Sequence, residues 1–221
     1  MKLVSIDGAL ATMIRLGDEV GPLNGYYLPE LFRLIGDRYG LQTIPSLEEA
    51  NATGAKFRTG QFQSGDRAIN ITELAIYSDG LSAITKDTKD SELVIRDLSL
   101  WLKDSLGFRD PITSPTIFFQ SDLVVDFDND PEKAFGFISP LIKFIDKERE
   151  SIYRINKPLQ FGRIGVGADP LQGHAFEFGF ERRIGAPWNL NRYFCKAHLP
   201  TDVHMRALEM LDALIGKAAK T

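Results

Sequence analysis

The densest group of residues that could do chemistry lies between positions 174 and 192. Arginine and tryptophan are side chains that often dominate protein–protein interfaces. A histidine near a glutamate could instead supply a general acid and a general base. The sequence therefore predicts a functional surface here, made of His174, Glu177, Arg182, Arg183, Trp188, Asn189, Asn191 and Arg192.

Glu177 and Glu181 are expected on the polar face of one strand, since residues an even number apart on a strand point to the same side. A strand rises ~3.3 Å per residue, which separates the two residues by ~13 Å. The two carboxylates of a glycosidase lie only ~5–9.5 Å apart. We therefore expect a solvent-facing ladder of charges in which Arg163 on the neighbouring strand takes part.

Trp188 follows Pro187 in a predicted loop, and two interpretations stay open. A tryptophan in a tight turn often folds back onto its own domain. An exposed aromatic side chain beside arginines is, however, typical of an interface anchor.

An acidic run that begins at Asp126 resembles a calcium-binding loop. An EF-hand needs glycine at its sixth position and glutamate at its twelfth. Pro131 and Phe137 occupy these positions, so the run is better explained as a strand end followed by a helix cap. A looser cation site made by Asp122, Asp126 and Asp128 stays an alternative.

Three glycines at positions 162, 165 and 167 resemble part of a dinucleotide fingerprint. That fingerprint works where a strand turns directly into a helix, whereas this segment runs into another strand. His198 and His204 are six residues apart, which does not fit two metal ligands at i and i+4 on a helix. The sequence predicts no cofactor, no metal site and no catalytic residue with a recognisable motif.

The single cysteine, Cys195, lies in an apolar run. It is expected as a half-buried strand residue, because a nucleophilic thiol needs a nearby base. His198, three residues on, would point to the opposite face of a strand.

The composition is that of an ordinary globular protein: 221 residues, 43% hydrophobic and 25% charged. A net charge of −4 disfavours nonspecific nucleic-acid binding, which needs a basic surface. We find no secretory signal and no apolar run long enough to span a bilayer. The default location is the cytoplasm.

The elements that must position these residues come in the same order twice: a strand, helix, three strands and an amphipathic helix. The halves cover residues 1–110 and 111–221, although one continuous domain is also possible. Residues 2–6 are predicted as a strand, or alternatively as part of an N-terminal helix that extends to residue 16. Asp79-Gly80 between two apolar runs is a strong hairpin signal. Phe176, Phe178 and Phe180 alternate with polar residues or glycine, so they should point into one core.

The predicted fold class is α+β, with one or two antiparallel sheets, helices mainly on one face, and possible duplication of a βαβββα unit. Residue identity between the halves is slight, so the duplication rests on element order alone. βαβββα order could also occur twice by chance.

Two functional hypotheses of different class follow. In the first, the chain is a non-catalytic interaction protein, analogous to bacterial accessory proteins, immunity-type inhibitors or complex subunits. Its partner would be a protein or a second copy of itself, and neither nucleic acid nor a membrane is expected. In the second, it is a small-molecule enzyme with a site between the halves, where His174, Glu177 or Asp169 acts as acid or base. A deep polar cleft would favour the enzyme, and a flat surface with Trp188 exposed would favour the binder.

Overall fold

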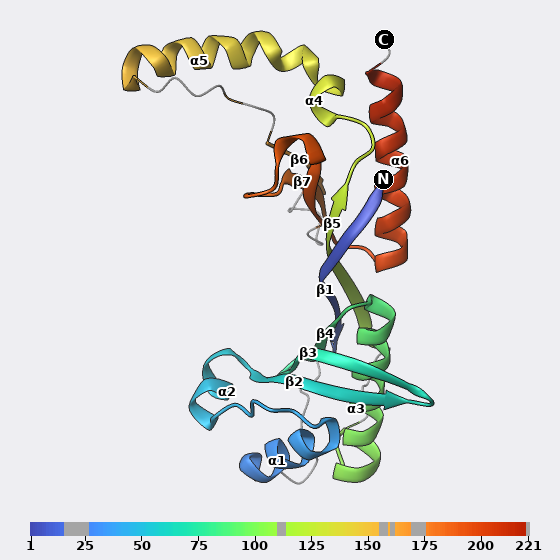
Figure 1. Cartoon of the computed structure of the whole chain (residues 1–221). Coiled ribbons are helices and arrows are strands. Elements are labelled where there is room, and N and C mark those ends of the chain that lie inside the picture. The colour runs from blue at the N-terminus through green and yellow to red at the C-terminus, as the bar shows by residue number, and fades with distance from the viewer. Residues whose placement is uncertain (16–26, 110–113, 155–158, 160–161, 169–175, 220–221) are drawn as a thin grey trace. The chain divides into compact units, whose positions relative to one another are not determined.

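The predicted α+β class is confirmed by a computed structural model, in which the described residues form six helices and eight antiparallel strands (Figure 1). The structure describes residues 1–15, 27–109, 114–154, 159, 162–168 and 176–219, without the side chains of residues 51–53 and 188. The strands are β1 (Lys2–Ile14), β2 (Ala55–Ser64), β3 (Arg67–Tyr77), β4 (Gly80–Thr85), β5 (Thr116–Asp126), β6 (Arg163–Gly167), β7 (Glu177–Arg182) and β8 (Arg192–Ala197). The helices are α1 (Leu28–Tyr39), α2 (Leu47–Thr53), α3 (Thr88–Leu106), α4 (Pro131–Ala134), α5 (Ser139–Tyr153) and α6 (Thr201–Ala218), with 3₁₀ turns η1 (Gly136–Ile138) and η3 (Trp188–Leu190).

The chain divides into two units, and each is described by itself. The N-terminal unit contains Ile6–Ser121 and His198–Thr201. The C-terminal unit contains Met1–Ser5, Asp122–Ala197 and Asp202–Thr221.

The N-terminal residues form a strand, so the alternative prediction of an N-terminal helix is wrong. β1 continues without a break from Lys2 to Ile14. Ala9, Ala11 and Met13 are buried while the residues between them are only partly so. This period of two is that of a strand with one buried face, and it outweighs the helix propensity of the alanines.

In the N-terminal unit, α1 and α3 cover one face of the strands β2, β3 and β4. Their apolar stripes follow the predicted helical spacing, and both helices end at a glycine in the left-handed region, Gly40 and Gly107. α2 begins with the predicted capping box between Ser46 and Glu49. The core of this unit includes Leu31, Phe32, Ile35, Tyr39, Phe57, Ile69, Ile71, Leu74, Leu81, Val94, Ile95, Leu98 and Leu102.

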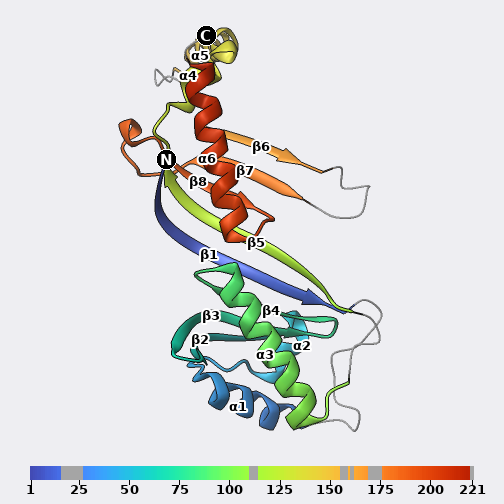
Figure 2. The same ribbon diagram turned by 90° about the vertical axis from the view of Figure 1, so that its right-hand side faces the viewer.

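In the C-terminal unit, α6 runs across the strands β7 and β8 (Figure 2). Phe127, Phe180 and Tyr193 pack ring against ring beneath it, with centroids 5.4–5.7 Å apart. Leu208 and Ile215 of α6 are fully buried. By contrast, no residue of α5 is buried.

The order of the strands in the sheet repeats. The sequence of neighbours is β2-β3-β4-β1-β5-β8-β7-β6, so β1 is followed outward by β4, β3 and β2, and β5 by β8, β7 and β6. The helices α3 and α6 follow the last strand of each set. At their first residues, Thr88 and Thr201 exchange hydrogen bonds, since each backbone N–H donates to the hydroxyl oxygen of the other (3.1 and 2.8 Å). An internal duplication stays a prediction, which this repeated order favours.

Among the helices in the described part of the chain, none is long and apolar enough to cross a membrane.

Candidate functional site

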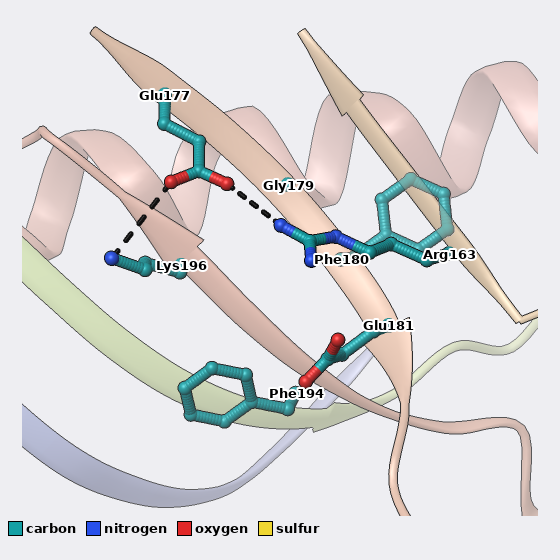
Figure 3. A pocket seen from close by; sticks show the side chains of 7 residues that line it. All are labelled: Arg163, Glu177, Gly179, Phe180, Glu181, Phe194 and Lys196. Carbon is teal, nitrogen blue, oxygen red and sulfur yellow. Dashed lines mark hydrogen bonds and ion pairs between the residues drawn. The ribbon is translucent and has the colours of Figure 1, made fainter. Parts of the chain in front are cut away.

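The strand β7 carries two different faces, and the predicted site divides between them. Phe178 and Phe180 alternate with Glu177, Gly179 and Glu181. The phenylalanines point to the side of α6, whereas the glutamates point to the opposite side. We call this second side the open face, and it carries Arg163, Glu177, Glu181, Phe194 and Lys196 (Figure 3).

A pair of glycines forms the floor of the open face. Gly165 of β6 lies opposite Gly179 of β7 in the register. Because neither has a side chain, the guanidinium of Arg163 can lie across them and reach Glu177, although its direct partner in the register is Glu181. A Cβ atom at Gly179 would come within 3.2 Å of the carbonyl oxygen of Ile164, so a larger residue would fit tightly there, whereas a Cβ atom at Gly165 would make only an ordinary contact of 3.9 Å.

The predicted charge ladder is present on this floor. Arg163 donates from Nη2 to Oε1 of Glu177 at 2.9 Å, and Nζ of Lys196 lies 3.8 Å from Oε2 of the same carboxylate. Figure 3 shows the carboxylate of Glu177 between these two cations. The carboxylate of Glu177 is therefore engaged by two cations and partly exposed.

Two shallow pockets meet at this face. One has a volume of about 150 Å³ and is lined by the charge ladder, Glu181 and Phe194. The second, of about 360 Å³, is lined by Glu181, Arg182, Arg183, Ile184 and Phe194. Both pockets therefore share a carboxylate and an aromatic ring.

The loop between β7 and β8 forms a hairpin whose tip is open to solvent. The backbone N–H of Arg183 donates to the carbonyl of Arg192 at 2.9 Å and closes the base of the loop. Ile184 is 98% exposed, and Gly185 follows it in the left-handed region at φ 82°. The guanidinium of Arg183 lies 6.0 Å from the centre of the Phe194 ring, within reach of a cation–π contact.

Two of the predicted arginines face elements of their own unit. Arg182 lies on the side of α6, with its guanidinium 4.9 Å from the centre of the Tyr193 ring. Arg192 holds both carboxylate oxygens of Asp126 at 2.7 and 2.9 Å. These hydrogen bonds lower the pKa of Asp126 and raise that of Arg192.

The remaining predicted residues lie in the loop between β7 and β8 or outside the residues that the structure describes. Asn189 is exposed, and Asn191 has a φ of 47° while its carbonyl accepts from the N–H of Phe127. His174 lies outside the described residues, as does the side chain of Trp188. Of the eight predicted residues, Glu177 and Arg183 therefore lie against the two pockets of the open face. Arg182 also borders the second pocket, although its guanidinium lies on the side of α6.

The carboxylates of the acidic run at the end of β5 bind other groups of the same protein. Asp126 pairs with Arg192, Asp128 pairs with the N-terminal ammonium, and Asp130 caps α4 by accepting from the N–H of Glu132. The expected strand end and helix cap are thus confirmed. The described residues contain no group of three or more carboxylate, histidine or cysteine side chains that could hold a metal ion.

Cys195, which was expected to be half-buried, is fully buried, and so is His204. Burial raises the pKa of the Cys195 thiol, which disfavours the reactive thiolate. The ring of His204 packs against that of Phe178 at 5.7 Å. Both residues therefore serve the core under α6.

Sequence reasoning missed Ile184, Phe194 and Lys196 as members of the surface. Phe194 and Lys196 alternate with the buried Tyr193, Cys195 and Ala197, so the period of two could have placed them beside Glu177 and Glu181. Nothing in the sequence separates the exposed Ile184 from the buried isoleucines.

Neither a protein-family model nor a curated protein matches this chain. The functional argument therefore rests on the geometry of the open face. Mixed charges around an aromatic ring, beside an exposed apolar side chain, can bind a protein surface that offers charged and apolar groups.

Proposed function

We propose that this protein is a non-catalytic interaction protein and that it binds a protein partner through the open face and the hairpin tip. The observation that carries the proposal is Ile184, a large apolar side chain that the hairpin holds almost entirely in solvent. Interfaces commonly place an apolar anchor at the centre and polar groups at the rim. Here Arg183 and Glu181 flank this anchor.

The second pocket supports this proposal by its position. It lies between the hairpin tip and the ring of Phe194, and its lining includes Glu181 and Arg183, so it offers groups of both charges. A partner could insert one side chain there while Ile184 contacts its surface. Loops held by a rigid sheet are common sites of recognition.

The enzyme alternative has less support in the described residues. Of its three acid or base candidates, His174 and Asp169 lie outside the described residues. Glu177 is held by Arg163 and Lys196. No observation favours catalysis, and we do not propose it.

The experiment is a capture of binding proteins with the purified chain and the variant Arg183→Ala, Ile184→Asp. We expect the variant to lose the captured protein while its melting temperature stays nearly unchanged, since both side chains are exposed. Trp188→Ala added to this variant tests the tryptophan by the same assay.

Met210→Asp is the matched control, because Met210 is an exposed apolar residue on α6, away from the hairpin. It should capture the same protein as the unchanged chain. Equal capture by the hairpin variant, or loss of capture by the control as well, would contradict this assignment of the surface.

A further inference from the structure

A cavity in the N-terminal unit shares no residue with the open face or the hairpin tip. Its volume is about 290 Å³, and it is bordered by α1, α2 and the adjoining ends of β2 and β3. Leu31 and Phe32 of α1 line it and are buried, whereas Leu28, one turn nearer the start of the helix, lines it and is 41% exposed. The apolar side of α1 therefore continues from the packed core into this cavity.

The space exists because small residues line the cavity where α2 joins β2. Ala50, Gly54 and Ala55 carry at most a methyl group. A Cβ atom at Gly54 would lie 2.5 Å from the ring of Tyr77, so a glycine is needed for this ring to lie against the backbone. Larger side chains at these positions would fill the cavity.

The described lining of the cavity is uncharged. Apart from apolar side chains it offers the hydroxyl groups of Tyr77 and Ser78. In the part of the chain that the structure describes, no hydrogen bond engages either hydroxyl. A charged ligand would lose hydration here without gaining an opposite charge. The chemistry of the lining therefore fits an uncharged molecule with an apolar body and a polar group.

The volume of the cavity limits the size of that molecule. An apolar cavity of ~150 Å³ holds benzene, and pockets for drug-sized ligands begin at ~300 Å³. The cavity of about 290 Å³ therefore has room for one ring or a short chain with its polar group. It is too small for a helix or a strand of a partner protein.

We propose that this cavity binds a small uncharged molecule that has a ring or a short chain as its apolar body and one hydroxyl, carbonyl or amide group. The apolar body lies against Leu28, Leu31 and Phe32, where its removal from water supplies the affinity. The polar group meets the hydroxyls of Tyr77 and Ser78, which fix its orientation.

The probe for the test is benzyl alcohol, an uncharged ring with one hydroxyl group. It is titrated into the whole chain, and NMR follows the methyl groups of Leu28, Leu31 and Ile76, which line the cavity. Their signals should shift with a dissociation constant of about 1 mM or tighter. Benzoate and benzylammonium keep the ring but carry a charge, so each should bind at least ~10-fold more weakly.

Two variants locate the probe. Ala50→Leu fills the cavity from α2 and should weaken binding of benzyl alcohol at least ~10-fold, because a close-packed site has no room for both groups. Glu48→Leu is the matched control, since it places the same side chain on the same helix at an exposed residue that does not line the cavity. It should bind like the unchanged chain.

Tyr77→Phe with Ser78→Ala is the second variant, which removes both hydroxyls without filling the cavity. It should weaken binding roughly three- to tenfold, as expected for a lost hydrogen bond. This variant decides the test if Ala50→Leu does not fold.

Three results would overturn the inference. The first is the absence of any shift of these methyl signals at ~10 mM benzyl alcohol, well above the expected dissociation constant. The second is equal binding of the charged analogues. The third is unchanged binding by the folded variants, which would place the probe outside the cavity. Ile184→Asp should bind benzyl alcohol normally, so failure of the proposed function and failure of this inference are separable.

Discussion

At the scale of single residues, the phenylalanines of β7 share a face but differ in burial. Phe180 is 2% exposed and touches two aromatic rings, whereas Phe176 is 38% exposed. We predict that Phe180→Ala lowers the free energy of unfolding by ~3–5 kcal/mol. Phe176→Ala should lower it by less than ~1 kcal/mol. Denaturation in urea measures both changes. Equal losses of unfolding free energy would contradict the difference in burial between Phe180 and Phe176.

The same three residues show where sequence reasoning stops. Their alternation predicts one shared face, and the register of β7 places Phe178 and Phe180 there. It does not predict how far α6 extends over that face, because the reach of a helix depends on packing between distant elements. Phe178 is consequently only half-buried.

The ion pair of Asp126 and Arg192 predicts a dependence of stability on pH. Hydrogen bonds from Arg192 lower the pKa of Asp126 below its ordinary value of 3.8 in the folded state. The unfolded chain therefore binds the proton more readily, so this stabilisation is present above the ordinary value and is lost as pH falls through the lowered one.

Asp126→Asn should accordingly flatten the fall in unfolding free energy below about pH 4. Urea denaturation at several pH values measures this slope. Part of the slope should remain, because hydrogen bonds from the N-terminus and Asn129 outweigh burial and lower the pKa of Asp212 as well. An unchanged slope in the variant would show that Asp126 contributes nothing to acid stability.

At the scale of elements, one carboxylate links α1 to α3. Asp97 of α3 accepts a hydrogen bond of 2.6 Å from the hydroxyl of Tyr39 and is held by Arg38 as well. Burial raises the pKa of Tyr39, so its hydroxyl stays protonated and donates. We predict that Tyr39→Phe lowers the unfolding free energy by about 1.5–3 kcal/mol, the usual contribution of a hydrogen bond to a charged group.

Tyr27→Phe is the matched control, because Tyr27 lies just before the same helix and is exposed. It should change stability very little. A similar loss in both variants would mean that the bond between Tyr39 and Asp97 does not stabilise the packing of the two helices.

Most elements could be predicted because their signals are local. The cap of α2, the glycine after α1 and the turn before Gly80 each depend on a few neighbouring residues. β1 was harder for a non-local reason. The alanines of β1 suit a helix until the neighbouring strand β4 is known.

At the scale of the whole molecule, the repeated strand order distinguishes inner strands from outermost ones. β4 pairs with β3 on one side and with β1 on the other, and five of its six residues are buried. β6 stands at the end of the strand order, where β7 is its neighbour, and most of its residues are exposed. Local opening should therefore need much less free energy in β6 than in β4.

Hydrogen exchange followed by mass spectrometry measures this difference. Amides of β4 should exchange at least ~10-fold more slowly than those of β6, because exchange of a strand paired on both sides requires larger openings. Protection of β6 that equals that of β4 would contradict its place as an outermost strand, since it would require a further strand on its outer edge.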